Sequence, residues 1–240
     1  MLEGEVLEAA FGKAAPAHYA WQTEAPGVAE HERALVRSAF EPLGTRVLDL
    51  GCGEGATLLH LGAPAGATGL DLFPEKIEFA RRTLPDCRFE VGSVYALPFP
   101  DGSFDHVLVR DVIHHLEQPT QLVNEAARVL APGGRLDVLE PCRYNPLIFA
   151  HALAVRAERG ELRSTTGFLR TLLSPRFEVA FSETFQGFPL HRLVFHPDLG
   201  RPSWGRGGLV KRLVDAVEKL GEGVVPRWAR AYIHLRATRR

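Results

Sequence analysis

A buried strand that ends in closely spaced glycines is the feature that most restricts how this chain can fold. Residues 47–55, VLDLGCGEG, run from an apolar segment through Asp49 into Gly51, Gly53 and Gly55. Because these glycines lack side chains, the backbone can adopt positive φ and pass close to a ligand. A helix that begins near Gly55 would present free N–H groups to that ligand. The segment therefore predicts a strand, a turn and a helix with a binding site at the turn.

Short apolar runs alternate with helical patterns along the rest of the chain. Strands are predicted over residues 46–50, 67–72, 87–93, 104–111, 134–141, 177–185 and 229–239. Helices are predicted over residues 30–40, 55–61, 74–84, 120–130, 143–163, 165–173 and 209–220. APGG, at residues 131–134, is expected to stop a helix and turn the chain into the next strand. This order predicts an α/β fold with a mostly parallel sheet that helices cover on both faces.

Two patterns in the C-terminal part predict one helix and one strand. Residues 209–220 carry apolar side chains at 209, 210, 213, 214, 217 and 220, an amphipathic stripe that predicts a helix. A helix docked on the core is favoured over the alternative, a lid over a site. Residues 229–239 are expected to close the sheet as its last strand.

Composition limits the class of protein and of partner. A chain of 240 residues with 45% hydrophobic content is long enough for one domain with elaborations. With 28 basic and 29 acidic residues the formal net charge is −1, so no overall charge favours DNA. The three cysteines are scattered and predict neither disulfides nor a zinc site. The first twenty residues lack a long apolar run, which predicts a cytoplasmic protein without a signal peptide or a membrane partner.

A second acid indicates what the glycine turn binds. Asp71 lies at the end of the next predicted strand, where a carboxylate can accept hydrogen bonds from both hydroxyls of a ribose. Asp49, before the first glycine, can accept a hydrogen bond from an ammonium group, which a pyrophosphate ligand would not supply. A ligand with an adenosine-like ribose and an amino-acid end satisfies both acids.

Several ordered motifs between Arg46 and Glu140 resemble one family. These are VLDLGCGEG, GLDLFPEKIEFAR, LPFPDGSFDHV and EAARVLAPGGRL. In this order the chain resembles the class I S-adenosylmethionine (SAM)-dependent methyltransferases. The resemblance implies a Rossmann-like, doubly wound, mostly parallel seven-stranded sheet with an antiparallel last strand, and SAM as cofactor. FGKAAPAHYA, which contains Tyr19, resembles the segment with which many members cover the cofactor.

Carried over by position, the resemblance implies a set of cofactor-binding residues. They are Tyr19, Asp49, Gly51, Cys52, Gly53, Asp71, Leu72, Phe73, Ser93, Val94 and Arg110. Asp49, Gly51 and Gly53 would line the methionine portion, Asp71 the ribose, and Leu72 and Phe73 the adenine. One position departs from the family, which commonly has an acid where this chain has Ser93. A hydroxyl accepts a hydrogen bond more weakly than a carboxylate, so a weaker cofactor site is expected there.

Methyl transfer by direct displacement mainly requires alignment of the acceptor and exclusion of water. His114 and His115 follow the fourth predicted strand and are the candidate catalytic residues. Glu140, Arg143, Tyr144 and Asn145 follow the fifth strand and are the candidate substrate-pocket residues. His114, His115 and Cys142 lack metal-ligand spacing, so no metal site is predicted.

These patterns predict a methyltransferase acting on a small molecule, with a single domain in three parts. Residues 1–45 would cover the cofactor, residues 46–141 would form its binding core, and residues 142–240 would carry the acceptor-pocket insertions. Three alternatives remain open: a methyltransferase-like binding or regulatory protein without activity, a methyltransferase acting on RNA or protein, and an NAD-dependent oxidoreductase. The acceptor and the oligomeric state do not follow from the sequence.

Overall fold

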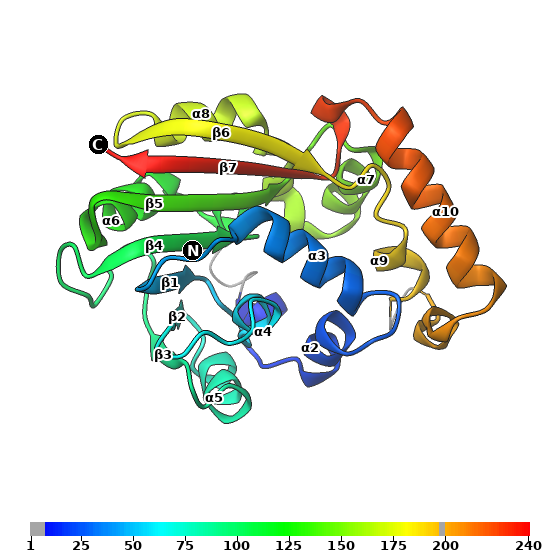
Figure 1. Cartoon of the computed structure of the whole chain (residues 1–240), viewed down its shortest axis with the longest axis horizontal. Helices are drawn as coiled ribbons and strands as arrows, with labels where there is room; N and C mark the ends of the chain where they lie inside the picture. The colour runs from blue at the N-terminus through cyan, green and yellow to red at the C-terminus, as the bar shows by residue number, and fades with distance from the viewer. Residues whose placement is uncertain (1–7, 197–199) are drawn as a thin grey trace.

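A single seven-stranded sheet organises the chain, for which the computed structural model describes residues 8–196 and 200–240. Its strands lie in the order β3-β2-β1-β4-β5-β7-β6 (Figure 1). They are β1 (Val47–Leu50), β2 (Thr68–Asp71), β3 (Arg88–Val91), β4 (Phe104–Arg110), β5 (Leu130–Pro141), β6 (Phe177–Phe185) and β7 (Tyr232–Arg239). Strands β1 to β5 pair in parallel, and β7 runs antiparallel between β5 and β6. The predicted fold class is confirmed, including its antiparallel last strand.

Helices of two kinds connect the strands. The α-helices are α2 (Pro16–Thr23), α3 (Ala29–Phe40), α4 (Ala56–His60), α5 (Pro74–Thr83), α6 (Pro119–Val129), α7 (Pro146–Ala154), α8 (Thr166–Leu173), α9 (His191–Val194) and α10 (Leu209–Val224). The 3-10 helices are η1 (Ile113–His115), η2 (Arg156–Arg163), η3 (Pro202–Arg206) and η4 (Arg227–Ala229). No helix in residues 8–196 and 200–240 is both long and apolar enough to cross a membrane.

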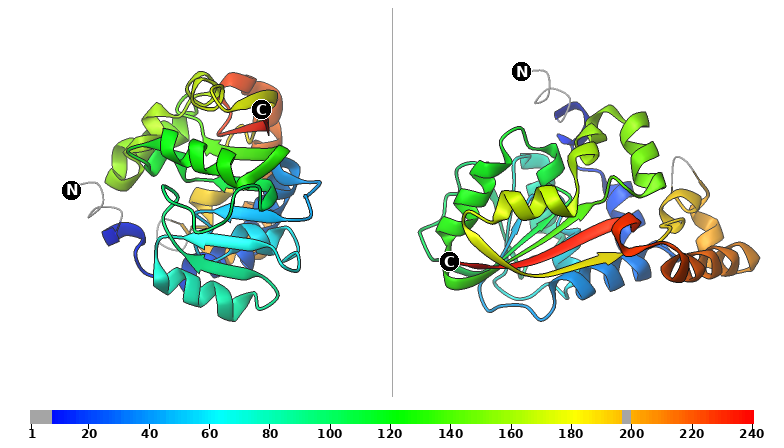
Figure 2. Two further views of the ribbon diagram at one scale, coloured as in Figure 1. Left: turned by 90° about the vertical axis from the view of Figure 1, so that its left-hand side faces the viewer. Right: turned by 90° about the horizontal axis from the view of Figure 1, so that it is seen from above.

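The sheet is buried on both faces because neighbouring residues of its central strands point to opposite sides. Leu48 and Leu50 pack in a cluster with apolar side chains of α6 and α8. Val47 packs in the other cluster with side chains of α3, α4 and α5. Figure 2 shows α3 and α8 on opposite sides of the sheet. Since Leu35, Val36, Ala39 and Phe40 of α3 are core residues, α3 belongs to the body of the domain.

The chain from 131 to 134 differs from the predicted turn. APGG lies inside β5, which pairs with β4 first at Leu130 and then again at Arg135. The register shifts between these pairs, so the extra residues bulge out of the ladder. Gly133 accommodates this irregularity with φ +73°.

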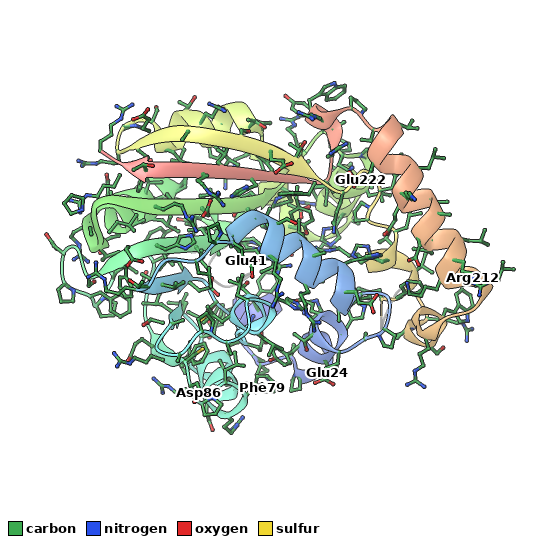
Figure 3. The ribbon with its side chains drawn as sticks, in the orientation of Figure 1. Glu24, Glu41, Phe79, Asp86, Arg212 and Glu222 are labelled. Carbon is green, nitrogen blue, oxygen red and sulfur yellow. The ribbon has the colours of Figure 1, made fainter. Side chains whose placement is uncertain are left out.

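Helix α10 also differs from expectation, because most of its apolar stripe faces outward. Leu209, Leu213 and Leu220 are 72%, 55% and 65% exposed, whereas Val214 and Gly221 are buried. The helix touches the domain with its other face, partly through Glu218, which accepts hydrogen bonds from the backbone and ring of His191. Figure 3 shows Arg212 toward the outer end of α10 and Glu222 near the sheet. The helix was predicted correctly, but the packing of its stripe was not.

Candidate active site

The glycines in the turn after β1 serve different purposes: Gly51 allows close packing within the protein, and Gly53 leaves space for a ligand. All three glycines have positive φ: Gly51 at +71°, Gly53 at +53° and Gly55 at +88°. A Cβ on Gly51 would lie 2.4 Å from Cγ2 of Val112, so internal packing requires a glycine there. Among the described residues, a Cβ on Gly53 would meet only Nζ of Lys76, at 4.0 Å. Gly53 therefore leaves open space that faces a cavity.

Asp71 at the end of β2 fastens this turn. Its Oδ2 accepts a hydrogen bond from the backbone N–H of Gly53 at 2.9 Å, and its Oδ1 accepts one from Phe73 at 3.0 Å. Parallel pairing of β1 with β2 brings the two strand ends together. A carboxylate oxygen has a second lone pair, and Asp71 lines the cavity, so it can also bind a ligand hydroxyl.

Asp49 lies beneath the turn and is 1% exposed. Its Oδ2 is buried without a hydrogen-bond partner among the described residues. Burial raises the pKa of the Asp49 carboxyl to about 7, although the positive charge of Arg110 opposes this shift. An orphaned carboxylate oxygen under a turn is suited to a cationic group that arrives with a ligand.

The cavity beyond the carboxyl ends of the strands has a volume of about 870 Å³. Ten of the predicted cofactor residues line it: Tyr19, Gly51, Cys52, Gly53, Asp71, Leu72, Phe73, Ser93, Val94 and Arg110. The Tyr19 hydroxyl is buried there without a hydrogen-bond partner in the described chain. The Ser93 hydroxyl accepts a hydrogen bond from the backbone of Tyr95. The structure thus brings this set together, with Asp49 directly below it.

The two predicted catalytic residues, His114 and His115, also line the cavity. Nδ1 of His114 lies 2.7 Å from Glu140 and its Nε2 lies 3.2 Å from Glu158, and these acids hold the pKa of His114 well above its usual value. Burial and the neighbouring His114 lower the pKa of His115 to about 4. The adjacent imidazoles therefore differ in charge at neutral pH.

The four predicted substrate-pocket residues lie elsewhere in the structure. Glu140 is fully buried and accepts hydrogen bonds from the backbone N–H groups of Val112, Ile113 and His114. Asn145 is buried as the N-cap of α7. Arg143 and Tyr144 are exposed and lie outside the residues that line the cavity. None of the four lines the cavity, because the chain after β5 turns outward at Arg143 and Tyr144, while Glu140 turns inward to organise η1.

A buried charge cluster beside the cavity was missed at the sequence level. Glu32 of α3 is 1% exposed, and its carboxylate accepts hydrogen bonds from Nη2 of Arg110 and from Nε and Nη2 of Arg192. The two guanidinium groups and His191 hold the pKa of Glu32 well below its usual value, against the effect of burial. One signal was available, because Glu32 falls on the same apolar helix face as Leu35 and Val36.

The insertion after β5 also supplies cavity residues that no local motif indicated. His151 comes from α7, and Glu158 and Glu161 come from η2; all three line the cavity. Leu193 and His196 line it from the region of α9. Glu158 lies beside His114 and His115, and His151 and Glu161 lie next to Glu158.

Comparison with known proteins agrees with this geometry. A family model described as a methyltransferase domain matches residues 48–138. The chain is 40% identical over 115 residues to a demethylmenaquinone methyltransferase of Thermus thermophilus, covering 45% of this chain and 52% of that protein. It is 35% identical over 159 residues to a probable SAM-dependent methyltransferase of Mycolicibacterium smegmatis, covering 60% of this chain and 62% of that protein. The chain thus spans about half the length of the curated relatives it matches.

A solved structure is similar over nearly the whole chain. It is a SAM-dependent methyltransferase of Thermotoga maritima, described as a possible histamine N-methyltransferase, with a TM-score of 0.66 and 20% identity. The superposition covers 98% of this chain and 99% of that protein, so the two share the fold along nearly their full length.

The sheet order and the acid-bound glycine turn define a Rossmann-like domain built to bind an adenosine-containing cofactor. Residues 48–138 match a methyltransferase domain, and the relative and the solved structure that the chain resembles are SAM-dependent methyltransferases.

Proposed function

We propose that this chain transfers a methyl group from SAM to a small-molecule acceptor in the cavity beside the glycine turn. One observation carries the proposal: Asp71 ties the backbone of Gly53 to the end of β2 and lines the cavity at the point where Gly53 leaves space. The orphaned oxygen of Asp49 fits the ammonium group of the same cofactor.

The residues on the cavity wall divide between the parts of the cofactor. Asp71 would accept hydrogen bonds from the ribose hydroxyls, and Leu72, Phe73, Ser93 and Val94 would surround the adenine. Gly51, Cys52, Gly53 and Asp49 would hold the methionine portion. When bound, the cofactor supplies an electrophilic methyl group on its sulfonium. Residues 8–23 would cover it, since the backbone of Ala15 donates a hydrogen bond to Glu54 of the turn.

The acceptor would occupy the part of the cavity beside His114 and His115. Leu147 and Ile148 of α7 and Leu193 of α9 also line the cavity and are candidate walls for it. A volume of about 870 Å³ shared between cofactor and acceptor favours a small molecule. The Thermus thermophilus relative is named for a quinone acceptor, demethylmenaquinone.

Calorimetric titration of the purified chain with SAM, S-adenosylhomocysteine and NAD tests the proposal. We expect both sulfur compounds to bind and NAD to give no heat. Binding of NAD without binding of SAM or S-adenosylhomocysteine would reject the proposal and favour the NAD-dependent alternative. Product analysis with candidate quinones and amines, using SAM labelled in its methyl group, then tests transfer.

Two glycine variants separate packing from ligand approach. Gly51→Ala is expected to cost about 2–5 kcal/mol of unfolding free energy, because its Cβ meets Val112 at positive φ. Gly53→Ala should cost only about 1–2 kcal/mol of backbone strain, yet weaken SAM binding by about tenfold or more, because its methyl group occupies the cofactor's approach. Urea unfolding measures the change in unfolding free energy, and calorimetry measures the change in SAM affinity. Normal SAM affinity in Gly53→Ala would place the cofactor elsewhere.

SAM affinity should also depend on pH through Asp49. With a pKa of about 7, this carboxyl is largely protonated at pH 6 and must lose its proton to pair with an ammonium group. Affinity should therefore rise between pH 6 and about 7.5, being roughly tenfold weaker at pH 6 than with the carboxyl fully ionised, and fall again above about pH 8, where the α-ammonium of SAM loses its proton. Asp49→Asn is the control, since it should bind weakly with little dependence between pH 6 and 8. An unchanged pH profile in Asp49→Asn would assign the dependence to another group.

A further inference from the structure

Three side chains at the acceptor end of the cavity have the spacing of metal ligands. Nε2 of His114 lies 3.2 Å from Oε2 of Glu158, and Nε2 of His115 lies 3.8 Å from the same oxygen. The ligand atoms of all three residues lie within 4.8 Å of one another. A tetrahedral ion with bonds of about 2.1 Å holds its ligand atoms roughly 3.4 Å apart. The observed separations lie on both sides of that value, so small side-chain shifts suffice to bind an ion.

A buried carboxylate behind His114 sets the orientation of its ring. Glu140 is fully buried, accepts three backbone N–H groups around η1 and lies 2.7 Å from Nδ1 of His114. With Nδ1 donating to Glu140, Nε2 is the nitrogen directed at Glu158, and an ion that binds there displaces the proton that Nε2 carries without metal. Metal-bound histidines usually donate their second ring N–H to a carboxylate. The carboxylate fixes the tautomer of the ring and raises the basicity of the nitrogen that binds the metal.

We propose that His114, His115 and Glu158 form a binding site for a divalent transition-metal ion. Two imidazoles and one carboxylate suit Zn²⁺, Fe²⁺, Co²⁺ or Mn²⁺ better than Mg²⁺ or Ca²⁺, which prefer all-oxygen ligand sets. All three residues line the cavity, so the remaining coordination positions face its interior. The site needs only these side chains and goes beyond the proposed function.

Glu158 belongs to two possible ligand groups, and the surrounding contacts favour one of them. His151 and Glu161 form a second possible group with Glu158, but Nδ1 of His151 already lies 3.3 Å from Glu161, and His151 is exposed. His114 is 4% exposed and has Glu140 behind it, which makes its side of Glu158 the better-organised position. One consequence rests on the proposed function: the open positions would select acceptors that carry a hydroxyl or carbonyl oxygen.

The test uses the full chain after treatment with a chelator, titrated with Co²⁺ while its visible absorption is followed. Wild type is expected to bind one equivalent with the bands of a four- or five-coordinate site. Glu158→Gln keeps the size of the side chain and should weaken binding by at least about tenfold. Glu218→Gln is the matched control, because Glu218 contacts His31 and His191 in a similar cluster that is outside the cavity lining.

Three results would overturn the site: no Co²⁺ bands in wild type, full binding by Glu158→Gln, or loss of binding in Glu218→Gln alone. If Glu158→Gln does not fold, His115→Asn replaces it with the same expected loss. The titration contains no SAM, so its failure is distinct from failure of the proposed function. Conversely, a chain that binds Co²⁺ but not SAM would keep the metal site and lose the methyltransferase proposal.

Discussion

Replacement of Asp71 by alanine is expected to weaken SAM binding by roughly 100-fold or more. Two charge-assisted hydrogen bonds to ribose hydroxyls contribute about 1.5–3 kcal/mol each, and every 1.4 kcal/mol is about tenfold in affinity. The variant also loses the acceptor for the N–H groups of Gly53 and Phe73, which loosens the turn that the cofactor contacts. Calorimetric titration with SAM measures the loss directly.

Asp86→Ala is the control for this variant. Asp86 is exposed between α5 and β3, where it is outside the cavity lining. It should bind SAM like the wild type, and both variants should be checked for folding by circular dichroism. If folded Asp71→Ala keeps wild-type affinity, Asp71 does not hold the ribose and the cofactor position proposed here is incorrect.

Replacement of Glu32 by alanine is expected to lower the unfolding free energy by about 3–5 kcal/mol. The variant leaves the guanidinium groups of Arg110 and Arg192 next to each other without the carboxylate that both contact. Burial makes this costly, because water cannot replace the lost partner. Urea unfolding of the chain without cofactor gives the measurement.

The matched control is Glu30→Ala on the same helix. Glu30 is exposed, so its replacement should change the unfolding free energy by no more than about 0.5 kcal/mol. Equal stabilities of the Glu30 and Glu32 variants would show that the buried cluster contributes little. Because Arg110 and Arg192 line the cavity, a folded Glu32 variant should also bind SAM more weakly.

Much of the fold could be predicted because its signals are local. Strand and helix patterns placed β1 to β7 and most helices, since alternation of apolar residues and prolines at helix starts depend on short stretches of chain. The packing of α10 could not be predicted in this way. Its stripe has apolar residues on two sides, and the side that docks is the one where Val214 packs against Trp21, Val28 and Phe195 and where Glu218 meets His191.

The sequence by itself determined how the proposed cofactor side of the site is assembled. Gly51, Gly53 and Asp71 stand at the ends of neighbouring parallel strands, and parallel pairing brings such ends together whatever the rest of the chain does. Only the tertiary structure decided the side of the cavity that His114, His115 and Glu158 form. Glu158 is 44 residues beyond His114, and it reaches the histidines because η2 packs against η1. Contacts of that kind follow from the packing of whole elements, which no local pattern of residues specifies.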